Sequence, residues 1–425
     1  KTLTFISRAL LLSAGLFSQE KRTLESRVED LLARMPVSSQ TDLDKYMTEM
    51  TDIGLQGWDM ICNRIIEPGT GNDTRARFVV ESYSRYLSAG NNKQVQSDWE
   101  KQCISVIKRS QVLNTRRFFF AQLQITGEEP SSVFSMEYIG NPDLAESALA
   151  VIASVGTEKS ELMLAEKLKD SNLQAAPTIM NILARWKSDL AVKEYITWYN
   201  IDNLSIKTAA INALAQSAHP GAYKTLASAA RASDFAWDPT GATSAYIKYA
   251  ANIGEMGNTK KMEKICREVL KGAGFDTGVQ YKSSALAVLV EKKGIESIDL
   301  LIKYFKSDNL EFRKHAIALA EKIPGDIATN KYIGAIDASE PEIASDIIWM
   351  LGDRGDIIAI APLKKLMFGG NINIRMASAE AVTSLAGINA ADILISYLQS
   401  YPEIEEQERG FALYSTIADA CLLYT

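Results

Sequence analysis

Histidine is almost absent from this 425-residue chain, which contains only His219 and His315. Neither has a serine, a cysteine or a second histidine at the spacing of a catalytic triad or a zinc site. The sequence therefore offers no recognisable catalytic constellation. We predict that this chain holds no metal, needs no cofactor and is not itself an enzyme.

Cysteine is also scarce, and its spacing excludes the common cysteine motifs. The four cysteines are Cys62, Cys103, Cys266 and Cys421. None stands in a C-x-x-C pair, which argues against a zinc ribbon or a thioredoxin motif. Each lies in apolar, helical sequence, so buried free thiols are the expectation. A bridge between Cys62 and Cys103 remains open for an oxidising compartment.

The chain lacks both a strong charge excess and a long apolar run. Its 46 basic and 52 acidic residues give a net charge of −6, which argues against a general nucleic-acid binder. A basic stretch, Lys108–Phe120, is interpreted as a helix pair with buried phenylalanines and solvated arginines. Nothing approaches 18 consecutive apolar residues, so no transmembrane segment is predicted.

The first residues have the layout of a secretory signal peptide. Lys1 and Arg8 flank a short apolar run from Ala9 to Phe17, which is too short to span a bilayer. We therefore expect residues 1–18 to be a signal peptide and the protein to be exported, to the periplasm or to the cell surface and beyond. A retained N-terminal helix is the alternative.

A period of 31 residues organises most of the chain. Four similar segments begin at Lys282, Arg313, Ala344 and Arg375, and three more begin at Ala145, Ala176 and Lys207. Each reads as the second helix, B, of a helical hairpin, and a shorter amphipathic helix, A, precedes it. A single hairpin cannot bury its own apolar faces, whereas stacked hairpins can. The period therefore predicts an all-α, right-handed α-α superhelix without a sheet.

The turn before helix B resembles the HEAT-repeat family of the HEAT/armadillo-like solenoids. "DNLSIKTAAINALA" from Asp202 and "SDNLEFRKHAIALA" from Ser307 carry the resemblance. The family places an Asp before helix B and a basic residue five positions later. The matching residues are Asp202 with Lys207, Asp308 with Arg313, and Arg375 at the basic position alone. The resemblance implies that they form a structural ladder between repeats, and an Asp there can also cap the helix.

Residues 19–140 are helical in pattern but out of phase with the repeat. We interpret them as degenerate N-terminal repeats that cap the HEAT-like repeats of residues 141–425. "EPGTGNDTRARFVVESYSRYL" and "RRFFFAQLQITG" resemble the N-terminal repeat regions of secreted bacterial proteins. Many of those end in a sandwich domain of the 3-keto-disaccharide hydrolase type. That resemblance implies a helical module whose catalytic part lies elsewhere.

Two successive repeats are longer than the rest and provide the candidate binding site. The extra residues, 231–243 and 271–281, are expected between helix A and helix B, as neighbouring insertions on one edge of the solenoid. Both contain an aromatic residue followed by Asp, Thr and Gly. The candidate residues are Phe235, Trp237, Asp238, Thr240, Phe275, Asp276, Thr277 and Tyr281. They suit a sugar ring or a protein partner. The alternative is that the aromatics fold back as packing.

Three functions remain open from the sequence. The first is a non-catalytic binding or scaffolding module, because solenoids offer long surfaces. The second is the accessory domain of a carbohydrate-active enzyme whose sandwich lies beyond residue 425. The third is a HEAT-like DNA glycosylase, which the acidic net charge opposes. We expect a protein or glycan partner and no nucleic acid.

Overall fold

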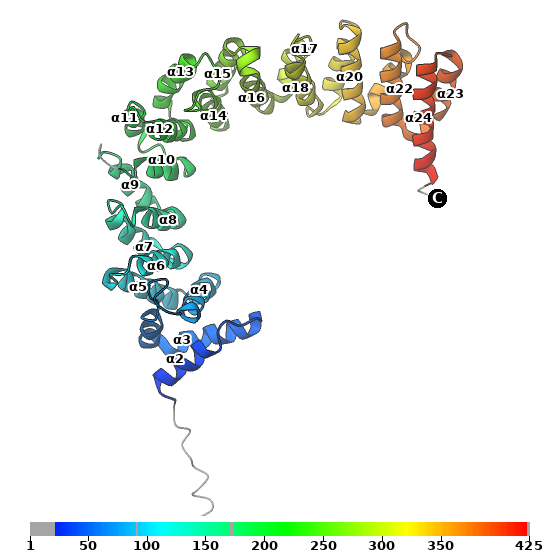
Figure 1. Cartoon of the computed structure of the whole chain (residues 1–425). Coiled ribbons are helices and arrows are strands. Elements are labelled where there is room, and N and C mark those ends of the chain that lie inside the picture. The colour runs from blue at the N-terminus through cyan, green and yellow to red at the C-terminus, as the bar shows by residue number, and fades with distance from the viewer. Residues whose placement is uncertain (1–21, 91, 171–173, 423–425) are drawn as a thin grey trace, which may run out of the picture. The chain divides into compact units, whose positions relative to one another are not determined.

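The computed structural model describes residues 22–90, 92–170 and 174–422, and these residues form helices and turns without a strand (Figure 1). Consecutive helices pair and the pairs stack, so the predicted all-α right-handed solenoid of HEAT-like hairpins is confirmed for the described residues. The predicted signal peptide, residues 1–18, lies outside them.

Contacts divide the chain into two compact units, residues 1–194 and 195–425. The division falls inside α11 (Val192–Tyr199). The other described helices of the first unit are α2 (Leu24–Ala33), α3 (Gln40–Cys62), α4 (Thr74–Ala89), α5 (Lys93–Arg109), α6 (Leu113–Thr126), α7 (Glu129–Ser135), η1 (Met136–Tyr138), α8 (Ala145–Val155), α9 (Glu158–Lys167) and α10 (Ala176–Arg185).

The core of the first unit is built on three large aromatic side chains. Trp58, Tyr83 and Trp99 are buried, and the rings of Tyr83 and Trp99 meet edge to face with centroids 5.0 Å apart. Both indoles satisfy their N–H groups, since Trp58 donates to the Met50 carbonyl at 2.7 Å and Trp99 donates to the Ser84 hydroxyl at 3.0 Å. Neither indole is therefore buried with an unsatisfied hydrogen-bond donor.

The second unit continues the hairpins to the end of the described chain. Its helices are α12 (Leu204–Ser217), η2 (Pro220–Ala222), α13 (Tyr223–Ala232), α14 (Ala242–Glu255), α15 (Thr259–Gly272), α16 (Phe275–Lys293), η3 (Gly294–Ser297), α17 (Ile298–Phe305), α18 (Leu310–Glu321), α19 (Asp326–Ile336), α20 (Pro341–Arg354), η4 (Ile357–Ala359), α21 (Ile360–Leu366), α22 (Ile372–Ala386), η5 (Gly387–Ala390), α23 (Ala391–Ser400) and α24 (Ile404–Leu422). The B helices α12, α14, α16, α18, α20 and α22 pack in that succession.

Asparagine begins several of the B helices. The side chains of Asn203, Asn309 and Asn371 accept hydrogen bonds from backbone N–H groups in the first turns of α12, α18 and α22. The expectation that Asp202 and Asp308 cap these helices is therefore wrong by one residue. The N-cap is the last residue with extended backbone before the helix begins. In both repeats that residue is the asparagine.

Two glycines end B helices where another residue would be strained. Gly294 ends α16 with φ 51°, and Gly387 ends α22 with φ 53°. Positive φ is costly for a residue with a Cβ atom, so glycine permits the chain to turn directly into helix A. Glycine thus marks the end of the B helix in these two repeats.

One apolar stretch of the described chain, Ile372–Ser400, is long enough by composition to cross a membrane. In the structure it comprises α22, η5 and α23, and α22 packs against α20 and α24. A hairpin in the core of a solenoid meets the same length and composition test, so the stretch is weak evidence for a membrane span.

Candidate binding site at the A–B turns

The first long A–B turn begins with two residues in the left-handed region. Asp234 and Phe235 have φ of 52° and 53°, which non-glycine residues rarely adopt. The Phe235 N–H donates to the Ala230 carbonyl at 3.0 Å, so the strained turn also ends α13. Such strain persists only where the surroundings impose it.

Phe235 is the anchor of this turn. Its side chain is buried, and its ring lies where a Cβ atom on Gly272 would stand, 2.4 Å from the nearest ring carbon. Its carbonyl oxygen would lie 3.0 Å from a Cβ atom on Gly278. Phe235 therefore packs into a space that exists because both residues are glycine. The structure brings the two long turns together, as the sequence predicts, but it makes Phe235 packing and not a free binding group.

Asp238 and Thr240 hold the end of the same turn. One Asp238 oxygen accepts from the Thr240 N–H at 2.8 Å and from the Thr240 hydroxyl, and the other accepts from the Ala242 N–H at 2.8 Å. The carboxylate thus fixes the chain as it enters α14. Both polar groups that were candidates for ligand binding are already committed to the turn.

Trp237 lies between these two fixed points of the turn. Its side chain is 71% exposed, although Phe235 two residues earlier is 8% exposed. The turn is thus anchored on one side by the Phe235 ring and on the other by the Asp238 carboxylate. Trp237 is a large aromatic surface displayed on a fixed backbone.

The second long segment, 271–281, differs from the expected loop. Residues 275–277 form the first turn of α16, and the helix then kinks at Gly278, whose φ is −146°. Helix B proper follows the kink, 31 residues before the start of α18. The extra residues therefore lengthen the helix, and its core side chain in this segment is Tyr281, while buried Ala273 lies at the end of α15. Asp276 and Thr277 are exposed.

Phe275 begins α16 with one face packed and the other in solvent. Its ring lies 5.7 Å from that of buried Phe312, and the Lys282 ammonium lies 4.8 Å from its centroid. Lys282 is itself buried and donates to the Leu270 carbonyl. Burial lowers the pKa of Lys282 because the charged form loses hydration. Phe275 remains 42% exposed and can contact a partner.

Two leucines extend the exposed aromatics into a row. Leu204 and Leu310 are the first residues of α12 and α18, and each is about half exposed. With Trp237 and Phe275 they mark the A–B turns of four successive repeats, and we call this set the apolar row. Neither leucine is among the residues predicted from the sequence, although an apolar first residue in a B helix was a visible signal. No cluster of His, Cys, Asp or Glu suited to a metal ion occurs in the described part of the chain.

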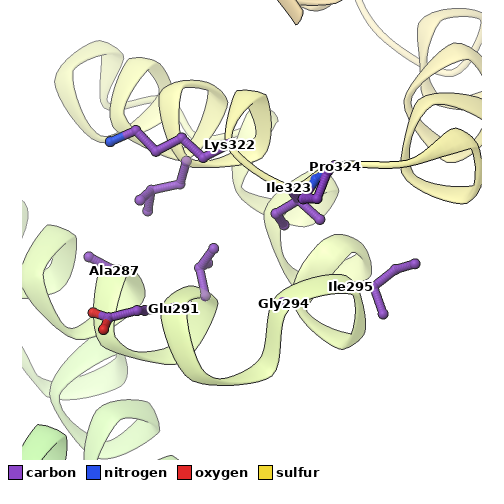
Figure 2. Close-up of a pocket in the computed structure, with 9 residues that line it drawn as sticks. Ala287, Glu291, Gly294, Ile295, Lys322, Ile323 and Pro324 are labelled. Atoms are coloured by element: carbon purple, nitrogen blue, oxygen red, sulfur yellow. The ribbon is translucent and has the colours of Figure 1, made fainter. Parts of the chain in front are cut away.

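The opposite edge of the second unit, where B helices turn into the next A helices, carries a cavity (Figure 2). The cavity has a volume of about 580 Å³ and lies between the C-terminal ends of α16 and α18. Val290, Ile295 and Leu319 contribute apolar lining, and Glu291 and Lys322 lie on opposite walls. A second cavity of about 400 Å³ lies on the same edge, beside the ends of α12 and α14.

One of the two predicted pairs of the ladder forms, and the other does not. Lys207 pairs with Asp202 at 3.0 Å, within its own turn. Arg313 instead pairs with Glu342 and Asp346 of the next repeat, and not with Asp308. A ladder between repeats therefore exists at Arg313, but its acids stand about one period later in the sequence. That spacing was the signal that could have identified them.

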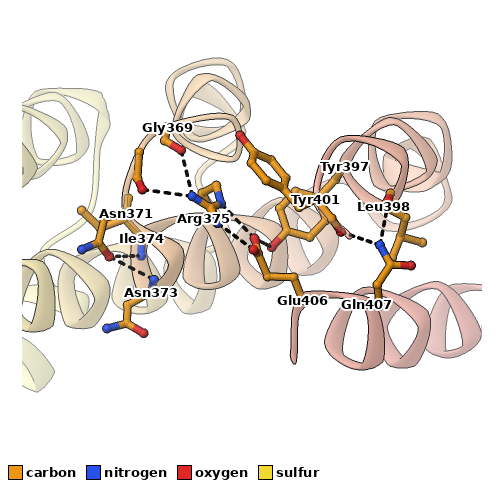
Figure 3. Close-up of polar contacts among 11 residues, drawn as sticks. Gly369, Asn371, Asn373, Ile374, Arg375, Tyr397, Leu398, Tyr401, Glu406 and Gln407 are labelled. Carbon is orange, nitrogen blue, oxygen red and sulfur yellow. Dashed lines mark hydrogen bonds and ion pairs between the residues drawn. The ribbon is translucent and has the colours of Figure 1, made fainter. Parts of the chain in front are cut away.

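Arg375 makes the most complete rung of this ladder (Figure 3). Its Nε and Nη2 atoms donate to the two oxygens of Glu406 at 2.8 and 2.6 Å, and its Nη1 donates to the Gly370 carbonyl at 3.0 Å. The Tyr397 hydroxyl donates to Glu406 at 2.6 Å, and the guanidinium carbon lies 4.1 Å from the Tyr401 ring centroid. Arg375 is 8% exposed and Glu406 is fully buried, so this pair joins α22 to α24 within the core.

Replacing Arg313 by alanine is expected to lower the free energy of unfolding by about 1–3 kcal/mol, because a buried guanidinium and its charged hydrogen bond are lost. Its partner Glu342 is exposed, so Glu342→Ala should cost no more than about 1 kcal/mol. Chemical denaturation of both variants measures the difference. Equal effects would mean that the pair acts as an ordinary surface salt bridge.

No family model matches the chain, and no curated protein matches it in sequence. Solved structures resemble it in fold. A Kap121p mutant is 11% identical, with a TM-score of 0.47, over 89% of this chain and 48% of that one. Kap95p, from a structure that concerns its binding to RanGDP, is 9% identical, with a TM-score of 0.47, over 93% and 61%. An engineered protein is 12% identical, with a TM-score of 0.28, over 85% and 99%.

Proposed function

We propose that this chain is a non-catalytic binding or scaffolding module that engages a protein partner through the apolar row. One observation carries the proposal: Trp237 is 71% exposed on a turn that Phe235 and Asp238 hold in place. A large exposed aromatic on ordered backbone has little conformational freedom left to lose when it binds. Tryptophan is also among the residues most enriched at the energetic centres of protein interfaces.

The polar groups of the turn favour a protein over a glycan as the partner. Sugar recognition needs polar groups that converge beside an aromatic face and are free to bind hydroxyls. Asp238 and Thr240 bind each other and the backbone of the turn instead. The row offers single apolar side chains at successive turns, and such a pattern suits a protein surface with matching pockets.

We also propose that the module acts outside the cytoplasm. Support comes from the sequence of residues 1–18, with its basic flanks and short apolar run. Fractionation of cells that make the chain, with and without residues 1–18, tests this point by locating the protein in each case.

Replacing Trp237 by alanine is expected to abolish partner binding without changing the melting temperature, because the exposed side chain contributes little to folding. The measurement is photocrosslinking in cells that make the protein, with benzoylphenylalanine in place of Leu204, the half-exposed member of the apolar row at the preceding A–B turn. A discrete protein adduct is expected, and it should be lost when Trp237→Ala or Phe275→Ser is added.

Trp349 supplies the matched control for this experiment. It is also exposed, but it lies within α20 and donates to Glu380 at 2.8 Å, away from the A–B turns. The same photoreactive residue at position 349 should give no such adduct. Equal adducts at positions 204 and 349, or an adduct at position 204 that survives Trp237→Ala, would contradict the proposal. An oligosaccharide bound by the wild type and not by Trp237→Ala would assign the row to glycans instead.

A further inference from the structure

A second row of exposed side chains lies on the opposite edge of the second unit, where B helices turn into the next A helices. Ile295, Ile327, Ile357 and Ile388 occupy the first or second position of η3, α19, η4 and η5. Their side chains are 44–74% exposed. Isoleucine thus recurs in solvent at four successive turns, and we call this set the isoleucine strip.

The stacking of the hairpins places these four residues side by side. The helices that precede them, α16, α18, α20 and α22, pack in succession, so equivalent turns are neighbours along one edge (Figure 1). Packed helices have axes about 8–10 Å apart, so we expect the isoleucines to recur at about that spacing. The cavity of about 580 Å³ opens at the first position, where Ile295 contributes to its lining.

The charges around the strip are predominantly acidic. The four turns, residues 291–299, 321–327, 353–359 and 386–392, contain eight acidic and four basic residues, a net charge of −4. The base Arg354 is buried and pairs with Asp356 at 2.6 Å, and Lys293 pairs with Glu263 at 2.8 Å. The acids with no ion pair among the described residues are Glu321, Asp326, Asp353 and Asp392, and all four are exposed.

The walls of the cavity add to this preference for positive charge. The C-terminal ends of α16 and α18 border the cavity, and helix C-termini carry partial negative charge. Glu291 stands on the α16 wall and Lys322 on the opposite α18 wall, so the negative side of the cavity is the α16 side, beside the apolar lining. An aliphatic side chain next to a cationic one would satisfy both features.

We propose that the isoleucine strip binds an extended, basic segment of a protein partner with an apolar residue at about every third position. A polyproline II chain has three residues per turn and rises about 3.1 Å per residue, so every third side chain points the same way at about 9 Å spacing. That spacing matches the distance between packed helices. The strip is separate from the apolar row, and its occupant need not be the partner of Trp237.

The test uses a synthetic fluorescein-labelled peptide of four Ile-Lys-Pro repeats, and fluorescence anisotropy with the whole chain. Binding should weaken as salt is raised, because the contact includes unlike charges. A peptide with Glu in place of Lys, and one with Ser in place of Ile, should each bind at least tenfold more weakly. Equal affinity for the lysine and glutamate peptides would overturn the charge argument and the proposal.

Variants of the chain locate the binding. Ile327→Ser combined with Ile357→Ser should weaken the lysine peptide at least tenfold with an unchanged melting temperature, because both side chains are exposed. Leu310→Ser makes the same kind of apolar-to-polar change on the apolar row and should leave the affinity unchanged. Unchanged affinity in the isoleucine double variant would overturn the proposal. Self-association that the double variant abolishes would assign the strip to a second copy of the chain instead.

Discussion

Replacing Glu406 by alanine is expected to lower the free energy of unfolding by about 3–5 kcal/mol. The reason is that the variant leaves the buried guanidinium of Arg375 without its carboxylate, and the Tyr397 hydroxyl without its acceptor. Chemical denaturation followed by circular dichroism measures the loss. Hydrogen exchange should place it in α22 and α24, the helices that the pair joins.

The matched control replaces both charged partners together. Arg375→Met with Glu406→Leu removes the buried ions and keeps apolar volume, so it should recover most of the stability that Glu406→Ala loses. A double variant as unstable as Glu406→Ala would mean that the ion pair itself, and not the stranded charge, supplies the stability.

The same pair predicts a response to acid. Burial acts to raise the pKa of Glu406, but its hydrogen bonds and charge contact with Arg375 and its bond to Tyr397 lower that pKa below the usual value. A carboxyl with a lowered pKa stabilises the fold above its unfolded pKa of about 4.5 and loses that contribution as the pH falls through the folded value. The wild type should therefore lose stability below about pH 4.5 more steeply than the Arg375→Met and Glu406→Leu double variant.

Replacing Phe235 by alanine is expected to cost about 3–5 kcal/mol, the range for a phenylalanine removed from a packed interior. Phe235 fills the space beside Gly272 and Gly278, so its removal leaves a cavity between two successive hairpins. Asp234 and Phe235 would also lose the packing that holds their left-handed backbone in place. Thermal and chemical denaturation give the magnitude.

Gly272 provides the second half of a double-mutant cycle. Gly272→Ala alone should cost about 1–3 kcal/mol, because the new methyl group meets the Phe235 ring. In the Phe235→Ala background the same change should cost much less, since the ring is gone. Additive losses would show that Gly272 is required for another reason and that Phe235 is not the anchor we describe.

The 31-residue period predicted the architecture because it records a packing requirement. Equivalent apolar positions must recur once per hairpin for neighbouring repeats to share a core. The beginnings of α18, α20 and α22 at Leu310, Pro341 and Ile372 follow that period closely. The residue that caps each B helix was harder to predict from the sequence, because Asp and Asn cap helices about equally well and both stand before helix B.

The sequence predicted where the candidate binding site lies, but not which of its aromatic side chains is exposed. Phe235 and Trp237 are two aromatics in one turn, and composition alone cannot decide which is buried. The decision depends on Gly272 and Gly278, which come more than 30 residues later and leave room for only one ring. The glycines near Phe275 favoured a loop on local composition alone. In the structure Tyr281 is buried and the segment forms a longer helix.

The buried cysteines make it possible to measure how often each unit opens. Cys62 and Cys103 in the first unit and Cys266 in the second are free and buried, and burial raises the pKa of Cys62 and of Cys266 to about 12. Thiols that are protonated and shielded react slowly with alkylating reagents and oxidants. Each unit therefore contains its own probe of opening, because the labelling rate of its cysteines reports how often that unit exposes its core.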